Sequence, residues 1–429
     1  MFLKTPSDIT VVGLGYVGLP LALAFADQIP TVGFDNDSLR IEQLLEGVDR
    51  NREVASEVIT ASSLTLTSNE NSVTNSDFII VTVPTPVTED FRPDLTLLES
   101  ASAMIGRRLR DRSGDRPAPI VVFESTTYPG CTEDFCGPII ERESGLKSGE
   151  GFILAYSPER TNFGDVEHTL GTVVKVVSAQ TDEAAGIVGS VYRRIAKAGV
   201  HTAPDIKTAE ASKVIENVQR DLNIALFNET AMIFDRMGID SSDVFDAAGT
   251  KWNFHQYQPG LVGGHCIPVD PYYLTYAAKQ VGYQANVILA GRSVNENMVD
   301  RIDLKIQELV RSAGNSPDET DVLILGQTFK SDVADFRNSK AMNLTSAMSE
   351  SFRSVATFDP FAGADDGNQD PFDCAAKFDV VVLAVGHAQF TKSISKVVDL
   401  VVAGGILVDL TGRVDRSRTA DSDLLFWKL

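Results

Sequence analysis

The sequence has few cysteines and no long apolar run. Four cysteines in 429 residues are too few for a disulfide framework and are typical of a reducing compartment. No apolar stretch approaches the roughly 18 residues that a membrane-spanning helix needs. The start of the chain, MFLKTPSDIT, lacks the apolar core of a signal peptide. We therefore expect a soluble, cytoplasmic protein with no membrane partner.

Basic residues are also scarce. The chain has 38 Lys and Arg against 59 Asp and Glu, which gives a formal net charge of -21. A field of this sign repels nucleic acid, so no nucleic-acid partner is expected. Any anionic ligand must be bound by a local group of cations or backbone N–H groups. The 5 histidines show no metal-ligand spacing, and no metal is predicted.

Short apolar runs alternate with helical stretches at both ends of the chain, which predicts parallel sheets covered by helices on both faces. The expected strands are 9–12, 31–34, 77–83, 119–123, 321–326, 355–359, 378–385 and 405–410. Between the two ends, residues 205–237 contain neither Pro nor Gly and predict one helix of about 50 Å. The fold class is therefore α/β, with two doubly wound domains joined by a long central helix.

A glycine motif, GLGYVG at residues 13–18, follows a predicted strand and precedes a predicted helix. This is the context in which GxGxxG binds the pyrophosphate of a dinucleotide at a helix N-terminus. Asp35 ends the next strand, where a carboxylate accepts hydrogen bonds from a ribose diol and repels a 2′-phosphate, so NAD is favoured over NADP. An ordinary glycine turn is the alternative. The predicted cofactor-binding residues are Gly13, Gly15, Tyr16, Val17, Gly18, Asp35, Arg40, Thr85, Pro86 and Thr126.

A cysteine lies in the segment LVGGHCIPVDPYY, residues 261–273. Two glycines before Cys266 let the backbone approach a ligand closely, and Asp270 shares its face if a helical turn forms. Such a cysteine acts as a nucleophile when a cation lowers its pKa. The alternative is a buried structural cysteine.

Three further groups of polar residues are candidates. Lys213 and Asn217 are spaced i, i+4 on the predicted central helix, although a solvated helix face is the usual reading of such a pair. Glu159, in YSPER, follows an apolar run and is placed to act as a general base. Lys330 and Arg337, in FKSDVADFRNS, are cations suited to phosphate. Arg337 could equally pair with a nearby aspartate of the same segment.

Taken together and in order, these motifs resemble the UDP-sugar 6-dehydrogenase family. The resemblance extends from about residue 8 to residue 412 and rests on GLGYVGLP, PTP, ESTTYPG, SPER, KVIEN, GGHCIPVDPYYL and FKSDVADFRNS. Family members use NAD to oxidise C6 of a UDP-hexose to a carboxylate. The resemblance implies a Rossmann-like NAD-binding domain at 1–203, a helical dimer core at 204–312 and a Rossmann-like UDP-binding domain at 313–429. We therefore expect a homodimer.

The cysteine motif also indicates a branch of the family. Members that use UDP-glucose carry Gly-Gly-x-Cys-Leu-Pro-Lys-Asp, whereas this chain has Ile267 and Val269 in place of the Leu and the Lys. It is more similar to enzymes of polysaccharide synthesis that act on UDP-N-acetylglucosamine or UDP-N-acetylgalactosamine. UDP-glucose remains the alternative substrate, and the C4 epimer stays open.

The resemblance implies a role for each candidate residue. Cys266 attacks the intermediate aldehyde and carries it as a thiohemiacetal and then as a thioester. Lys213 stabilises the oxyanion, and Glu159 activates the water that hydrolyses the thioester. The implied catalytic residues are Cys266, Lys213, Asp270, Glu159, Thr126 and Asn217. The implied substrate-binding residues are Glu159, Arg160, Lys213, Asn217, Tyr257, Gly260, Gly263, Lys330 and Arg337.

Three other functions remain as alternatives. A two-electron dehydrogenase needs no nucleophile, and Cys266 in its glycine setting argues against it. A UDP-sugar epimerase is expected to have Tyr-x-x-x-Lys on a helix, whereas the best-placed lysine here lies in Lys-x-x-x-Asn. A catalytically silent NAD- or UDP-sugar-binding protein is expected to have lost one of four residues, all of which are present: Cys266, Lys213, Asp270 and Glu159.

Overall fold

The computed structural model describes residues 4–161, 167–363, 369–373, 376–418 and 423–429. The chain packs as two compact units. The first unit contains Met1–Glu216 and Tyr272–Gln284, and the second contains Asn217–Pro271 and Ala285–Leu429. The boundaries of the three domains expected from the sequence stay a prediction.

The first unit is built on an eight-stranded sheet with the order β3-β2-β1-β4-β5-β6-β7-β8. Neighbouring strands are parallel except β6 and β7, which are antiparallel. The strands are β1 (Ile9–Val12), β2 (Thr31–Phe34), β3 (Thr65–Thr67), β4 (Phe78–Val81), β5 (Ile120–Phe123), β6 (Ile153–Tyr156), β7 (Lys175–Ala179) and β8 (Val200–Thr202). Every residue of β1, β4, β5 and β6 is buried, as the apolar runs at 77–83 and 119–123 predicted for β4 and β5.

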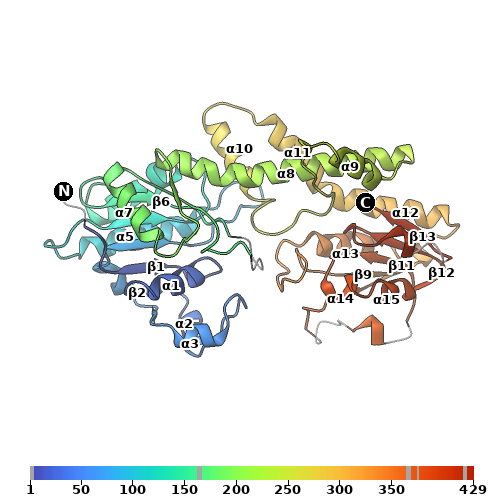
Figure 1. The fold of residues 1–429 in the computed structure, drawn as a ribbon, viewed down its shortest axis with the longest axis horizontal. Helices are drawn as coiled ribbons and strands as arrows, with labels where there is room; N and C mark the ends of the chain where they lie inside the picture. The colour runs from blue at the N-terminus through green and yellow to red at the C-terminus, as the bar shows by residue number, and fades with distance from the viewer. Residues whose placement is uncertain (1–3, 162–166, 364–368, 374–375, 419–422) are drawn as a thin grey trace. The chain divides into compact units, whose positions relative to one another are not determined.

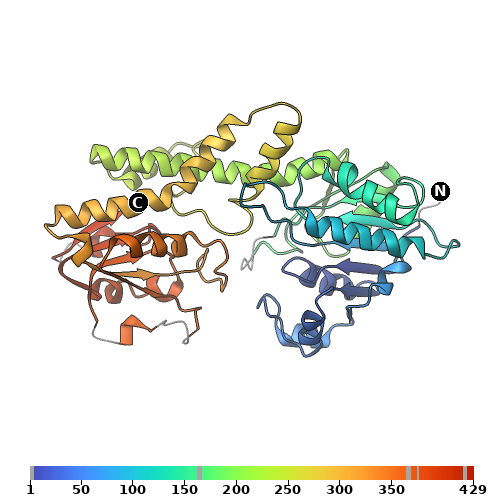
Figure 2. The same cartoon turned by 180° about the vertical axis from the view of Figure 1, so that it is seen from behind.

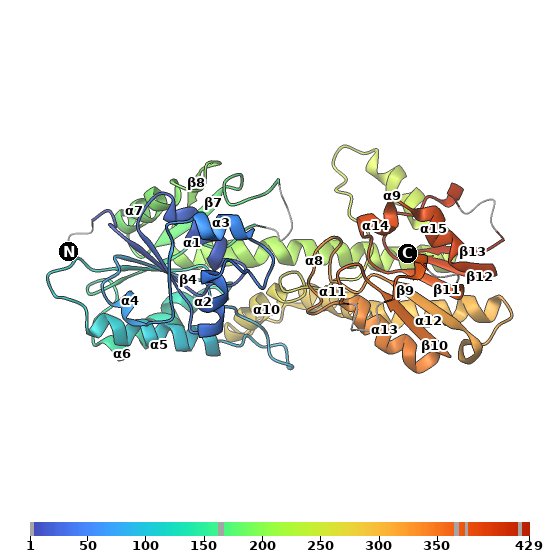
Figure 3. The same cartoon turned by 90° about the horizontal axis from the view of Figure 1, so that it is seen from below.

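Helices cover both faces of this sheet (Figures 1 and 3). Helices α1 (Gly18–Ala26) and α7 (Asp182–Tyr192) pack in the hydrophobic core of one face. Helices α5 (Thr96–Arg110) and α6 (Gly137–Ser144) pack in the core of the other face and lie beside each other in Figure 2. The smaller helices are α2 (Ser38–Leu45), α3 (Ser56–Ala61), α4 (Asn71–Thr74) and a π-helical turn at Thr132–Cys136. The predicted doubly wound arrangement is confirmed.

The predicted central helix is α8 (Ile206–Met237), which is unbroken over 32 residues. Gly238 follows it with a φ of 70°, a left-handed conformation that suits glycine and ends the helix. Four further helices follow along the chain: α9 (Ser241–Gly249), α10 (Asp270–Gln280), α11 (Asn286–Glu296) and α12 (Met298–Ser312). Among the described residues, no helix is long and apolar enough to cross a membrane.

The second unit contains a five-stranded parallel sheet with the order β10-β9-β11-β12-β13. Its strands are β9 (Asp321–Leu325), β10 (Ser354–Phe358), β11 (Phe378–Leu383), β12 (Val401–Asp409) and β13 (Leu425–Lys428). Helices α12 and α13 (Lys340–Ser351) pack in the core of one face, and α14 (Ala388–Thr391) and α15 (Ile394–Asp399) in that of the other (Figure 3). Strand β9 has β10 on one side and β11 on the other. The strand order therefore reverses beside β9, which is where open α/β sheets bind ligands.

Candidate active site

The three glycines of GLGYVG have different surroundings in the first unit. Gly13 has a φ of 95°, and its N–H donates to the Phe34 carbonyl at 2.8 Å. A Cβ atom on Gly18 would lie 1.8 Å from the Gly13 carbonyl oxygen, whereas a Cβ on Gly15 would have no atom within 4 Å. Gly18 therefore lets helix α1 pack against the turn. Gly15 keeps open the space in front of the helix N-terminus, which is the cradle that a pyrophosphate needs.

Asp35 and Arg40 hold the backbone of this turn. The Asp35 carboxylate accepts the Leu14 N–H at 2.8 Å, and the Arg40 Nε donates to the Leu14 carbonyl at 3.0 Å. The Arg40 guanidinium also forms an ion pair with Asp49 at 2.8 Å, and both side chains are about 1% exposed. The structure thus places Arg40 beneath the turn, where it pairs with protein groups. Asp35 directly follows β2, at the position that the sequence predicts for a ribose contact.

The loops that follow β4 and β5 are tied together. The Thr85 hydroxyl donates to the Thr126 carbonyl at 2.7 Å. The hydroxyl of Tyr273, on α10, donates to the Thr85 carbonyl at 2.6 Å and to the Pro86 carbonyl at 3.3 Å. The predicted cofactor-binding residues Thr85, Pro86 and Thr126 therefore lie together near the carboxyl ends of neighbouring parallel strands.

Glu159 belongs to a buried charge cluster that sequence reasoning missed. The Lys175 Nζ lies 2.7 Å from a carboxylate oxygen of Glu124 and 3.4 Å from one of Glu159. The second oxygen of Glu124 accepts the hydroxyl of Tyr192. The Glu159 carboxylate also accepts the backbone N–H groups of Arg160 at 2.8 Å and of the following residue. The Glu159 carboxylate therefore has one buried cation and two backbone N–H groups as partners.

The charges of this cluster set the protonation of its two carboxyl groups. Burial would raise the pKa of Glu159, but Lys175 and the backbone N–H donors outweigh it and hold the pKa below the ordinary value. Burial dominates at Glu124 and raises its pKa. Opposing burial, the two carboxylates raise the pKa of Lys175. Glu159 is therefore a carboxylate at neutral pH, which is the form that a general base requires.

The polar side chains on one face of α8 are buried, so the interpretation of Lys213 and Asn217 as a solvated helix face is wrong. Lys213 and Asn217 are 8% and 6% exposed, and Glu210 is fully buried. The Glu210 carboxylate accepts the N–H and hydroxyl of Thr132, at 2.9 and 2.7 Å, and the hydroxyl of Thr127 at 3.1 Å. Glu210 thus anchors the helix that carries Lys213 to the loop after β5. Nearby, Arg160 forms an ion pair with Glu216 at 2.7 Å.

The cysteine loop lies in the second unit. The Asp270 N–H donates to the Cys266 carbonyl at 2.8 Å, so the predicted helical turn does form. The Asn217 side chain donates to the Asp270 carboxylate at 2.6 Å, and Asp270 is only 2% exposed. Cys266 itself is half-buried. The asparagine on α8, a poor helix former, is thus explained by the carboxylate that it holds.

The glycines before Cys266 make room for another loop of the second unit. A Cβ on Gly263 would lie 2.7 Å from the Asn338 carbonyl oxygen, and one on Gly264 would lie 2.7 Å from the Phe329 ring. Gly264 has a φ of 90°, which further favours glycine. The sequence predicted a close approach to a ligand, whereas in the structure these glycines approach the segment that contains Lys330.

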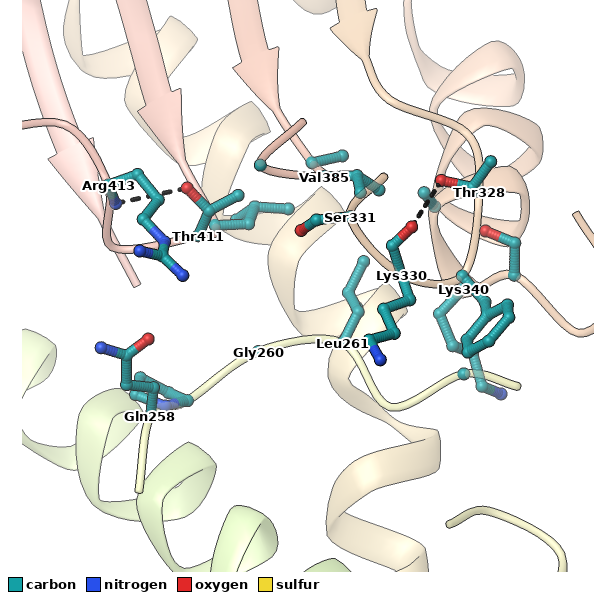
Figure 4. A pocket seen from close by; sticks show the side chains of 18 residues that line it. Gln258, Gly260, Leu261, Thr328, Lys330, Ser331, Lys340, Val385, Thr411 and Arg413 are labelled. Atoms are coloured by element: carbon teal, nitrogen blue, oxygen red, sulfur yellow. Dashed lines mark hydrogen bonds between the residues drawn. The ribbon is translucent and has the colours of Figure 1, made fainter. Parts of the chain in front are cut away.

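A pocket opens at the carboxyl ends of β9, β11 and β12 (Figure 4). Lys330 and Arg413 enter it from different loops and point toward the segment around Gly260. Lys340 also lines it and pairs with Glu296. Both Gly260 and Gly263, predicted from the sequence, line the pocket. In a chain of net charge -21, the positive charge of these side chains suits an anionic ligand.

Arg413 and Lys340 were missed by sequence reasoning. Arg413 belongs to Thr-Gly-Arg, which follows β12 as the Lys330 segment follows β9, so its place after a parallel strand was the available signal. Two predicted residues have protein partners. The Arg337 guanidinium forms an ion pair with Asp335 at 2.7 Å, which is the alternative reading of its motif. The Tyr257 ring packs 6.1 Å from the ring of Phe227.

The chain matches known proteins over nearly its whole length. A UDP-N-acetyl-D-glucosamine 6-dehydrogenase of Pseudomonas aeruginosa is 45% identical over 419 residues, which cover 96% of this chain and 98% of the relative. Protein CapL of Staphylococcus aureus is 43% identical over 428 residues, which cover 98% of this chain and 99% of the relative. The NAD-binding, central and UDP-binding domains of the UDP-glucose/GDP-mannose dehydrogenase family match residues 7–196, 207–297 and 323–416. The chain belongs to the UDP-glucose/GDP-mannose dehydrogenase family.

A solved structure supports the family fold. The UDP-D-ManNAc dehydrogenase from Pyrococcus horikoshii superimposes with a TM-score of 0.87 at 28% sequence identity, covering 98% of each chain. As a member of the UDP-glucose/GDP-mannose dehydrogenase family, the protein is an NAD-dependent nucleotide-sugar dehydrogenase. The glycine turn lies in the NAD-binding match, and the cationic pocket has Lys330 and Arg413 in the UDP-binding match.

Proposed function

We propose that the protein oxidises C6 of a UDP-N-acetylhexosamine to the uronic acid, with UDP-N-acetylglucosamine as the favoured sugar. The observation that carries this proposal is Cys266 on the turn that also presents Asp270, because a cysteine nucleophile distinguishes a four-electron oxidation from a simple alcohol oxidation. Two relatives named as UDP-N-acetyl-D-glucosamine 6-dehydrogenases, at 45% and 44% identity, support the sugar. Val269, in place of the lysine of UDP-glucose enzymes, also supports it. UDP-N-acetylgalactosamine and UDP-glucose are the competing substrates.

The glycine turn and its neighbours would hold NAD. Gly15 leaves room for the pyrophosphate at the N-terminus of α1, where the N–H groups of the first helical turn attract an anion without any formal positive charge. Asp35 would accept hydrogen bonds from the adenosine ribose and repel a 2′-phosphate. When bound, NAD accepts a hydride from C6 in each of the two oxidations, so one sugar consumes two NAD.

The first oxidation turns the C6 alcohol into an aldehyde. A water held by Thr126, Lys213 and Asp270 would take the hydroxyl proton while the hydride leaves C6. The Lys213 ammonium would stabilise the negative charge that develops on the C6 oxygen. Asn217, which donates to the Asp270 carboxylate, would keep that carboxylate oriented and help to place the C6 oxygen.

The second oxidation proceeds through a covalent intermediate. The Cys266 thiolate would attack the aldehyde carbon to form a C–S bond, and the resulting oxyanion takes a proton to give a thiohemiacetal. Loss of the second hydride from C6, together with the hydroxyl proton, would give a thioester. Water, deprotonated by Glu159, would then attack the thioester carbon, and the C–S bond would break with the electron pair returning to the Cys266 thiolate. The acid would lose its proton and leave as the carboxylate. Because the aldehyde stays bonded to the enzyme, it need not escape between the two oxidations.

The cationic pocket of the second unit would bind the UDP part of the substrate. Its position at the ends of β9, β11 and β12 is the expected place for a nucleotide on an open parallel sheet. Lys330 and Arg413 would face the diphosphate. They provide the local positive charge that an anionic substrate needs in a chain of net charge -21.

The helical part of the second unit would form a homodimer. On α8, Leu226, Ile233 and Met237 are 56%, 46% and 63% exposed, and their spacings of seven and four residues place them on one helix face. Val287 on α11 is also exposed. An apolar face of this kind is typical of a subunit interface. We further propose that the enzyme acts in the cytoplasm and that its uronic acid product supplies polysaccharide synthesis.

The variant Cys266→Ser tests the covalent mechanism. We expect it to form no uronic acid, because a serine hydroxyl is a much weaker nucleophile than a thiolate. NAD affinity should stay unchanged, since the glycine turn does not involve Cys266. The measurements are product analysis by mass spectrometry, NAD titration and thermal unfolding. Acid formation at the wild-type rate would contradict the thioester.

A further inference from the structure

A buried histidine, His387, contacts the loop that carries Lys330. This loop, residues 326–332, connects the end of β9 to the pocket and is called here the Lys330 loop. His387 is fully buried at the start of α14. Its Nδ1 accepts the Asp332 N–H at 2.9 Å, and the Asp332 carboxylate accepts the Ala388 N–H at 2.9 Å. The loop and the start of α14 are therefore joined by two reciprocal hydrogen bonds.

These contacts define the tautomer of His387. Because Nδ1 accepts a backbone N–H, it carries no proton, and in the neutral ring the proton lies on Nε2. The Nε2 atom is 3.1 Å from a carboxylate oxygen of Asp359 and 3.1 Å from the Thr328 hydroxyl. The same hydroxyl donates to the Lys330 carbonyl at 2.9 Å (Figure 4). Both ring nitrogens therefore contact groups that fix the Lys330 loop.

The anion that faces Nε2 is held in place by the backbone. The Asp359 carboxylate accepts the N–H groups of Gln327 at 2.6 Å, Thr328 at 3.0 Å and Phe361 at 2.8 Å. Burial would raise the pKa of Asp359, but the hydrogen bonds from His387 and from the backbone hold it below the ordinary value. Asp359 is thus a fixed acceptor at the end of β10, and His387 links it to the far end of the loop.

The Lys330 loop needs such support because its backbone is strained. Asp332 has a φ of 60°, a left-handed conformation that is uncommon for residues other than glycine. A conformation of this kind persists when surrounding contacts determine it. The hydrogen bonds of Asp332 to His387 and Ala388 do so, two residues beyond Lys330.

We propose that His387 is a positioning residue for nucleotide binding. With its proton on Nε2, His387 fixes the Lys330 loop so that Lys330 contacts the diphosphate of the nucleotide sugar. The inference rests on the proposed assignment of the pocket to the nucleotide. Among the described residues, Gly386 lines the pocket and His387 does not. His387 therefore acts through the loop and has no part in the oxidation of C6.

Two substitutions separate the roles of the two ring nitrogens. The Asn side chain of His387→Asn offers an oxygen near the position of Nδ1, which can accept the Asp332 N–H. The longer side chain of His387→Gln places an amide near the position of Nε2, which can donate to Asp359 but leaves the Asp332 N–H without its acceptor. His201, an exposed residue of β8, provides the control variant His201→Gln.

The readouts are the Kd for UDP by calorimetry, the KM for the UDP-sugar, kcat, the Kd for NAD and the thermal unfolding temperature. For His387→Gln we expect the Kd for UDP and the KM to rise about three- to tenfold, which is the effect of one lost hydrogen bond at a part-buried donor. We expect kcat and the Kd for NAD to change less than about twofold, because chemistry and cofactor binding use other residues. His387→Asn should recover most of the affinity for UDP, and His201→Gln should match the wild type.

Wild-type affinity for UDP in His387→Gln would overturn the inference. An equal loss in both His387 variants would overturn the role of Nδ1. A fall in kcat, NAD affinity and unfolding temperature together would show that His387 only supports the fold. If the wild-type protein failed to bind UDP, the assignment of the pocket itself would be wrong, which distinguishes failure of the proposed function from failure of the inference.

Discussion

Two alanine substitutions in the glycine turn separate cofactor binding from folding. In Gly18→Ala the new Cβ would lie 1.8 Å from the Gly13 carbonyl oxygen and 2.4 Å from the Thr82 hydroxyl, whereas real Cβ contacts are essentially never shorter than 3.0 Å. One of these atoms belongs to the backbone, so the turn or the start of α1 must move. We expect a loss of at least about 3 kcal/mol in unfolding free energy, the upper range for overpacking.

Gly15→Ala should weaken cofactor binding and leave the stability of the fold nearly unchanged. Its Cβ would meet no atom within 4 Å, so the fold accepts it, and unfolding free energy should change by less than about 1 kcal/mol. The methyl group would, however, occupy the space that the pyrophosphate needs in front of α1. We expect the Kd for NAD to rise at least about tenfold, which corresponds to about 1.4 kcal/mol.

The assays are thermal or denaturant unfolding and titration with NAD by calorimetry. The UDP affinity of the second unit serves as an internal control and should be unchanged in Gly15→Ala. Wild-type NAD affinity in Gly15→Ala would refute the cofactor cradle. Wild-type stability in Gly18→Ala would refute the close approach of helix and turn.

Two further predictions concern charge in the first unit. Lys175→Met removes the cation that lowers the pKa of Glu159, so Glu159 should take up a proton at higher pH. The acid limb of the profile of kcat against pH should therefore move to higher pH. If rates measured from acid to neutral pH show an unmoved acid limb, Glu159 is not the base. Asp35→Ala removes the carboxylate that would bind the ribose diol and repel a 2′-phosphate. The KM for NAD should rise several-fold, and the preference for NAD over NADP should fall. Unchanged kinetics with both cofactors would show that the ribose contact is misassigned.

The parallel strands could be predicted because their signal is local. The runs at 9–12 and 31–34 coincide with β1 and β2, since a strand covered on both faces is mostly apolar. The antiparallel pairing of β7 with β6 could not be predicted in this way, because an apolar run reads the same in either direction. Strand β13 (Leu425–Lys428) was missed because it is short and three of its four residues are only partly buried.

The residues of the candidate site could likewise be predicted only where the signal is local. Gly15 and Cys266 could be predicted because the residues next to them in the sequence form a recognisable motif. Lys175 and Glu124 are 51 residues apart, and neither lies in a motif that marks a charge cluster, so only the fold brings them together. The role of His387 could likewise not be predicted from the sequence, because its partners Asp332 and Asp359 come from two other loops.

The direct test of the central claim is the amount of NADH formed per UDP-sugar consumed by the wild-type enzyme. UDP-N-acetylglucosamine, UDP-N-acetylgalactosamine and UDP-glucose are offered separately, with NADH measured by absorbance and the sugar by chromatography. We predict two NADH per sugar, with an N-acetylated sugar preferred, because both hydrides leave the same carbon. Preference for UDP-glucose at the same ratio would contradict the interpretation of Val269, and one NADH per sugar would contradict the covalent role of Cys266.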